Sequence, residues 1–129
     1  MSTTQQSAAV AVARAHVEAW SSQDFDKARE LLAPDVRVTA TTTAPYPPDT
    51  DLTGVDDYMA GLVAYAQPIK PGSMRVLSSV GDERNALLML TVEADFGGGK
   101  MILPGARLYL LDDDTKIKSE QVIFFGSPE

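Results

Sequence analysis

The sequence has no cysteine, which excludes a disulfide framework, a cysteine nucleophile and a cysteine-based zinc site. Basic residues are also scarce, since 11 Lys and Arg stand against 18 Asp and Glu for a net charge of −7. A protein of that sign repels phosphate backbones, so nucleic acid is not an expected partner. No apolar run is long enough to span a bilayer, and the first residues lack the basic segment of a signal peptide. We therefore expect a cytoplasmic protein that does not bind membranes.

Motifs for common cofactors are missing as well. The glycines at 97–99 have no following helix whose N-terminus could bind a phosphate. The three acids at 112–114 alternate in direction at an expected turn, which favours solvated charge over a cation site. There is no zinc-ligand spacing and no nucleophile elbow. We expect neither a cofactor nor a metal ion.

What the chain does have is an informative order of elements. Its 129 residues suit one domain spanning residues 1–129. Alanine-rich residues 7–21 predict a first helix, Asp24 is an N-cap for a second short helix, and Thr53 with Asp56 resembles a capping box that opens a third. A β-branched strand at 35–43 separates the second and third helices.

Four strands follow the helices, at residues 74–80, 85–96, 100–111 and 115–125. This order predicts an α+β fold in which a cone-shaped, curved, mostly antiparallel sheet wraps three N-terminal helices. Pro104-Gly105 within the third of these strands indicates a bulge or an edge. The strands are apolar on both faces, and only one face can meet the helices. We therefore expect a homodimer through the other face of the sheet.

The run from His16 to Val36 (HVEAWSSQDFDKARELLAPDV) carries a resemblance to a known superfamily. It resembles the opening of nuclear transport factor 2-like proteins, which include SnoaL-like polyketide cyclases and ketosteroid isomerase. The Leu52-Thr53-Gly54 lead into the third helix and the closing Phe124-Phe125-Gly126 fit the same pattern. The resemblance implies the cystatin-like α+β roll with a pocket between helices and sheet. It does not imply one activity, because this fold hosts isomerases, cyclases, dehydratases, epoxide hydrolases and non-catalytic binders.

A comparison with ketosteroid isomerase tests one of those activities. That enzyme uses an aspartate base with a tyrosine and a protonated aspartate. The resemblance places its tyrosine at His16 and its two aspartates at Ala40 and Ala106. Both carboxylates are thus missing, which argues against ketosteroid isomerisation. Epoxide hydrolases of this fold use an Asp-Arg-Asp set, for which the sequence offers no evident pair of pocket acids.

His16 is the candidate catalytic residue. It is the only histidine, it lies on the apolar stripe of the first helix one turn from Trp20, and imidazole titrates near neutrality. It could act as acid or base on a carbonyl compound, or it could be a buried histidine satisfied by backbone or water. Gln121 could orient it or grip a ligand carbonyl, or bond to a neighbouring strand. A loop aspartate, Asp49 or Asp51, could supply the missing base, although solvated turn residues are the commoner case.

The remaining predicted pocket residues are apolar or aromatic. They are Val12, Trp20, Val38, Ala40, Tyr46, Tyr58, Met59, Leu62, Leu90, Val92, Ile102, Ala106, Leu108, Ile123 and Phe125. Such a lining suits a small hydrophobic ligand with one or two polar handles. The leading hypothesis is isomerisation, cyclisation or dehydration of a hydrophobic carbonyl compound without a cofactor. The alternative is a module that binds a hydrophobic ligand, or dimerises, without catalysis.

Overall fold

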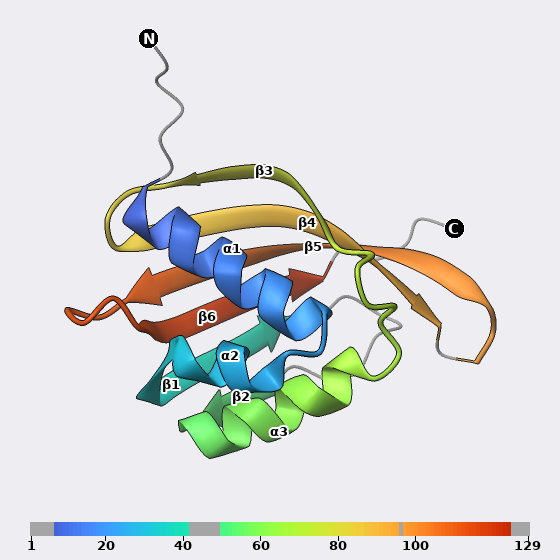
Figure 1. The fold of residues 1–129 in the computed structure, drawn as a ribbon, viewed down its shortest axis with the longest axis horizontal. Helices are drawn as coiled ribbons and strands as arrows, with labels where there is room; N and C mark the ends of the chain where they lie inside the picture. The colour runs from blue at the N-terminus through green and yellow to red at the C-terminus, as the bar shows by residue number, and fades with distance from the viewer. Residues whose placement is uncertain (1–6, 42–49, 96, 125–129) are drawn as a thin grey trace, which may run out of the picture.

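The computed structural model describes residues 7–41, 50–95 and 97–124, and it has a helical layer on one face of a curved sheet (Figure 1). The elements follow one another as α1 (Ala8–Ser21), α2 (Phe25–Glu30), β1 (Leu32–Thr41), β2 (Thr50–Thr53), α3 (Val55–Ala66), β3 (Arg75–Gly81), β4 (Asn85–Asp95), β5 (Lys100–Leu111) and β6 (Ile117–Phe124). The predicted α+β architecture is confirmed. None of the helices in the described ranges is long and apolar enough to cross a membrane.

Local signals set the helix ends. The Ser7 side chain accepts a hydrogen bond from the Val10 amide at 3.2 Å and caps α1, and Asp24 caps α2 by accepting from the Lys27 amide at 3.3 Å. The third predicted helix is present as α3, but its predicted cap is wrong, because the N-cap is Gly54 rather than Thr53. Gly54 adopts a φ of 97°, which favours glycine, and Thr53 ends the short strand β2, which the sequence did not predict.

The sheet has the strand order β2-β1-β6-β5-β4-β3. All neighbours pair antiparallel except β1 and β6, which are parallel. The expected bulge at Pro104-Gly105 is absent, because β4 and β5 pair without a register shift from Asn85 to Asp95. Pro104 pairs with Thr91 of β4, and the described pairing of β5 with β6 begins at Gly105.

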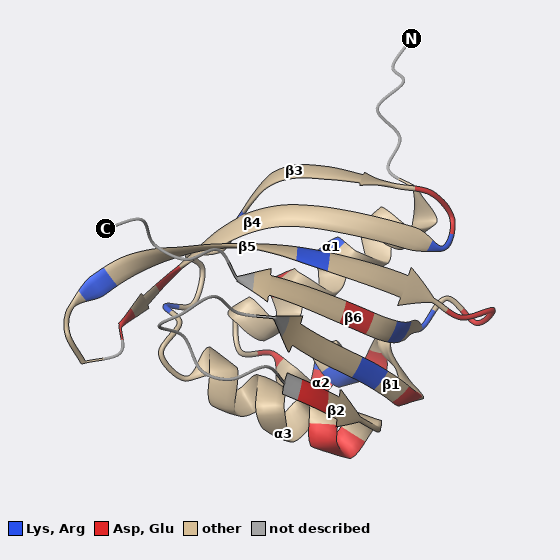
Figure 2. Ribbon diagram, turned by 180° about the vertical axis from the view of Figure 1, so that it is seen from behind, with Lys and Arg blue, Asp and Glu red and all other residues tan. Residues whose placement is uncertain are grey.

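The three helices cover the concave face of the sheet, with α1 packed against β4 and α3 against β1 and β2 (Figure 1). The core between the helices and the sheet contains the large, fully buried side chains of Trp20, Tyr109, Leu88 and Leu111. Over the opposite face, the described part of the chain places no helix (Figure 2).

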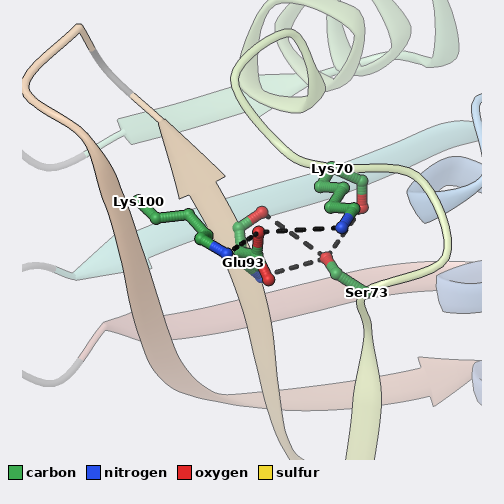
Figure 3. A network of polar contacts seen from close by, with 4 residues as sticks. All are labelled: Lys70, Ser73, Glu93 and Lys100. Atoms are coloured by element: carbon green, nitrogen blue, oxygen red, sulfur yellow. Dashed lines mark hydrogen bonds and ion pairs between the residues drawn. The ribbon is translucent and has the colours of Figure 1, made fainter.

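A polar cluster ties the connection after α3 to the sheet (Figure 3). The Ser73 hydroxyl donates to the Lys70 carbonyl at 2.7 Å and accepts from the Glu93 amide at 3.0 Å. The Glu93 carboxylate lies 3.8 Å from Lys100 Nζ and 4.0 Å from Lys70 Nζ. These solvent-accessible ion pairs stabilise little, and they lie apart from the residues that line the cavity described next.

Candidate active site

A cavity of about 180 Å³ lies between α3 and the β2–β1–β6–β5 half of the sheet. Its walls are mostly apolar, and its polar groups come from two tyrosines and one ion pair. The lining residues are Val38, Ala40, Leu52, Tyr58, Gly61, Leu62, Tyr65, Arg107, Glu120 and Val122. Gly61 suits this helix position because a Cβ there would come within 2.8 Å of Leu52 Cδ1.

The polar centre of the cavity is the pair formed by Arg107 on β5 and Glu120 on β6. Arg107 Nη1 donates to Glu120 Oε2 at 2.7 Å, and the two side chains are only 4% and 1% exposed. In the register, Val122 lies opposite Arg107, so Glu120 is its diagonal neighbour on the same face of the sheet. A buried ion pair is often no more stable than apolar residues of the same size. Its presence in a cavity wall therefore indicates a role other than stability.

Aromatic rings hold the guanidinium of Arg107 in place. Its Cζ lies 4.7 Å from the centre of the Trp20 ring and 5.5 Å from that of Tyr65. The two rings meet edge to face, with centroids 5.6 Å apart. Cation–π contacts of this kind are strongest when they are shielded from water, as they are here. Trp20 thus supports the pair from behind and does not line the cavity.

Behind Glu120, a short chain of hydrogen bonds leads through Tyr58 to His16. The Tyr58 hydroxyl donates to Glu120 Oε1, and its oxygen lies 3.5 Å from His16 Nε2. An ionised carboxylate can only accept, so the single phenol proton is committed to Glu120. His16 Nε2 must therefore carry the imidazole proton and donate to Tyr58. This leaves His16 Nδ1, which is buried, without a hydrogen-bond partner among the described residues.

These surroundings set the ionisation of the cluster. Burial lowers the pKa of His16 to about 4, a shift that nearby Glu120 opposes and Arg107 reinforces. Burial would raise the pKa of the Glu120 carboxyl, but Arg107, His16 and the Tyr58 hydrogen bond together hold it below its usual range. Burial followed by the charge of Glu120 raises the pKa of Tyr58. At neutral pH the site therefore holds a carboxylate, a guanidinium, a neutral imidazole and a neutral phenol.

Some predicted pocket residues lie where the sequence placed them. Val38, Ala40, Tyr58 and Leu62 line the cavity. His16 and Trp20 are fully buried directly behind the lining. Tyr46 and Phe125 lie outside the described residues, as does Asp49. Asp51 lies on β2, where it forms a bidentate exposed pair with Arg37, with contacts of 3.0 and 2.8 Å, and so does not reach the cavity.

Other predicted pocket residues lie elsewhere. Leu90 and Val92 point inward but belong to the core, as does Met59, and Val12 packs against that core. The predictions for the last two strands chose the wrong face. The affected residues lie on the face of the sheet opposite to the one that carries Arg107 and Glu120. They are Ile102, Ala106, Leu108, Gln121 and Ile123. Leu108 is 41% exposed and Ile123 43% exposed on the uncovered face.

Glu120, Arg107 and Tyr65 line the cavity but were not among the predicted site residues. The predicted residues Gln121 and Ala106 each lie one position away in the sequence. One signal was available, because Arg107 interrupts an apolar strand and Glu120 follows on the next strand, across the turn at 112–114. A buried charge in such a strand needs a partner of opposite sign, and Glu120 is a candidate for that role.

The fold, the apolar cavity and the buried ion pair define a small α+β pocket protein. Residues 13–120 match the SnoaL-like domain, and the chain belongs to that family. A comparison with curated proteins finds no match. Among the described residues, no three His, Asp or Glu side chains gather as metal ligands would.

Solved structures share the fold over nearly the whole chain. A Kribbella flavida protein is 27% identical with a TM-score of 0.78, covering 95% of this chain and 91% of its own. An epoxide hydrolase of the LEH-like type from Mycobacterium tuberculosis is 15% identical, with a TM-score of 0.70 and coverage of 92% and 83%. A second protein from that organism, solved with estradiol-17beta-hemisuccinate, is 14% identical, with a TM-score of 0.75 and coverage of 95% and 96%. The last two similarities concern the fold alone.

Proposed function

We propose that this SnoaL-like protein binds a small hydrophobic carbonyl compound in the cavity and catalyses proton transfer on it. Glu120 would remove a proton from the carbon next to the carbonyl, and the electron pair would move onto the carbonyl oxygen. Arg107 would hydrogen-bond that oxygen as its negative charge develops. Return of the proton from Glu120 to another carbon gives isomerisation. Attack of the enolate on a second carbonyl, with the proton passed from Glu120 to the new alkoxide, gives cyclisation. Loss of a β-hydroxyl, which takes up the proton from Glu120 and leaves as water, gives dehydration.

The observation that carries this proposal is the Arg107–Glu120 pair in an otherwise apolar cavity wall. A base and an oxyanion partner within one hydrogen bond of each other are the minimum that enolisation requires. Arg107 is buried among apolar and aromatic side chains, and this low-dielectric setting strengthens its interaction with a developing charge. Glu120 remains ionised at neutral pH: burial alone would raise its pKa, but Arg107, His16 and Tyr58 together outweigh that effect.

Deuterium exchange provides a test that does not require the natural substrate. Cyclohexanone incubated in D₂O with the protein is expected to exchange its α-protons faster than buffer allows, as followed by proton NMR. Glu120→Gln is expected to abolish that excess rate. Glu93→Gln is the matched control, since it neutralises a glutamate paired with Lys70 and Lys100 outside the cavity (Figure 3).

Ala40→Leu is a second variant that guards against misfolding of Glu120→Gln. Ala40 lines the cavity, so a larger side chain should block the ligand without removing a charge. Exchange that is unaffected by both Glu120→Gln and Ala40→Leu would contradict the proposal.

Binding without chemistry is a second candidate function. It is favoured by the two hydrogen bonds that already occupy Glu120, one to each oxygen, which make the carboxylate a weaker base. This candidate would be supported if cyclic ketones bind in a saturable way that Ala40→Leu removes, while their α-protons do not exchange above the buffer rate.

A further inference from the structure

We infer that the cavity selects a neutral molecule of about one ring that presents a hydroxyl, either as an alcohol or as the enol of a ketone, to the Arg107–Glu120 pair. This inference rests on the proposed function and narrows its substrate class. Three properties of the cavity lead to it: its volume, its balance of charge, and its donors and acceptors.

The volume limits the ligand to one ring with a short substituent. The cavity measures about 180 Å³. An apolar cavity of about 150 Å³ in another protein holds one benzene molecule, and pockets for drug-sized ligands begin at about 300 Å³. The rigid parts of the boundary are the helix α3, through Gly61 and Leu62, and the strands through Val38 and Val122. A molecule with fused rings exceeds this volume, so part of it would have to extend beyond the residues that line the cavity.

The charge balance selects a neutral ligand. Arg107 and Glu120 neutralise each other at 2.7 Å, and neither side chain is more than 4% exposed. A carboxylate ligand would have to share Arg107 with Glu120, which would leave one negative charge in excess inside the protein. An ammonium ligand would leave one positive charge in excess beside Arg107. Either case leaves a buried charge without compensation, which is strongly unfavourable.

The donors and acceptors select a hydroxyl. Arg107 can only donate, and ionised Glu120 can only accept. Tyr58 has committed its one proton to Glu120. A ligand atom that meets the pair must therefore accept from Arg107 and donate to Glu120, and an alcohol, phenol or enol oxygen does both. A ketone only accepts, so its enol satisfies the pair better than the ketone itself, which is the preference that enolisation requires.

The experiment is a titration with probes of matched shape, followed by chemical shift changes in the protein. The probes are para-cresol, benzoate, benzylamine as its ammonium form, and estradiol, which joins a phenol to a steroid frame. We expect para-cresol to bind in a saturable way, the two charged probes to bind about a hundredfold more weakly, and estradiol not to bind. Glu120→Gln should weaken para-cresol binding, while Glu93→Gln should not.

A paired variant tests the volume argument. Leu62→Ala enlarges the cavity and is expected to admit naphthol, a phenol with two fused rings. Leu111→Ala removes the same atoms from the core, because Leu111 is buried but does not line the cavity. It should leave the choice between cresol and naphthol unchanged.

Each outcome decides between the two proposals. If benzoate, benzylamine or estradiol binds more tightly than para-cresol, the inference about neutral single rings is wrong, while the proposed pocket function stands. The inference is also wrong if the protein exchanges the protons of cyclohexanone but does not bind para-cresol. If no probe binds and no exchange occurs, both proposals are wrong.

Discussion

The buried pair of Arg107 and Glu120 gives the sharpest prediction about stability. Removing one member leaves the other as an uncompensated charge, because both side chains are at least 96% buried. The usual cost of breaking such a pair is about 3–5 kcal/mol. In a domain of 129 residues a loss of 3 kcal/mol lowers the melting temperature by roughly 10 °C. We expect this loss for Arg107→Met and for Glu120→Leu.

The double variant Arg107→Met/Glu120→Leu should be more stable than either single variant. It removes both charges and fills the space with apolar atoms, which is often neutral or stabilising. Urea unfolding of the four proteins gives the interaction energy as a double-mutant cycle. Arg37→Met is the control, because it makes the same substitution in a pair whose side chains are 59% and 56% exposed. It should change the unfolding midpoint far less.

The pH dependence of Arg107→Met provides an internal check. Without Arg107, burial is the largest influence on the Glu120 carboxyl and raises its pKa. Because a raised folded-state pKa contributes stability only at low pH, the variant should be closer to wild type at pH 5 than at pH 7. The reasoning is refuted if both single variants are as stable as Arg37→Met, or if the double variant loses the sum of the single losses.

Three further predictions concern other parts of the molecule. His16 has a folded-state pKa of about 4, against 6.5 for an exposed histidine. The free energy of unfolding should therefore fall as the pH drops from 6.5 toward 4, by about 2 kcal/mol at pH 5. Urea unfolding of His16→Gln should lack this part of the loss. Leu108 and Ile123 lie on the uncovered apolar face, so we expect light scattering at micromolar concentration to show a homodimer. The double variant Leu108→Glu/Ile123→Lys should be a monomer. A monomeric wild type would contradict this prediction. A Cβ at Gly81 would lie 2.3 Å from the Asn85 carbonyl oxygen, so Gly81→Ala should lower the free energy of unfolding by about 2 kcal/mol or more. A Cβ at Gly98 would have nothing within 4 Å, so Gly98→Ala should leave the urea midpoint unchanged.

The order of elements could be predicted because each signal is local. Alanine content and the Asp24 cap define α1 and α2, and β-branched residues define most of β1. The failures arose where the outcome depends on contacts distant in sequence. Strand β2 is only four residues long and exists because Thr50 to Thr53 pair with β1. Its formation places Thr53 in the sheet, so that Gly54 takes over the cap of α3.

The face of each strand was harder to predict, because β5 has apolar residues on both sides and β6 has polar residues on both sides over residues 118–121. Alternation assigns a face only when one side is polar. Ala106 and Leu108 were correctly predicted to share a face with Gln121 and Ile123, since these residues are partners across β5 and β6. The whole group was predicted to face the pocket, but it lies on the other face of the sheet. The irregularity between Leu110 and Leu111, near the turn, further obscures the phase of β6.

Opposite charges in an apolar hairpin would have resolved the choice of face. In an antiparallel pair, the register that places Leu108 opposite Gln121 also places Arg107 and Glu120 together on the other face. Burying either charge alone is costly, so a buried face of this hairpin can hold these charges only as a pair. The lone histidine received more weight because imidazole titrates near neutrality, yet full burial removes that property from His16 and keeps it neutral. In a cavity of this fold, a pair of opposite charges is thus a better guide to the ligand-facing residues than a single titratable group, since the pair is stable inside the protein only in one arrangement.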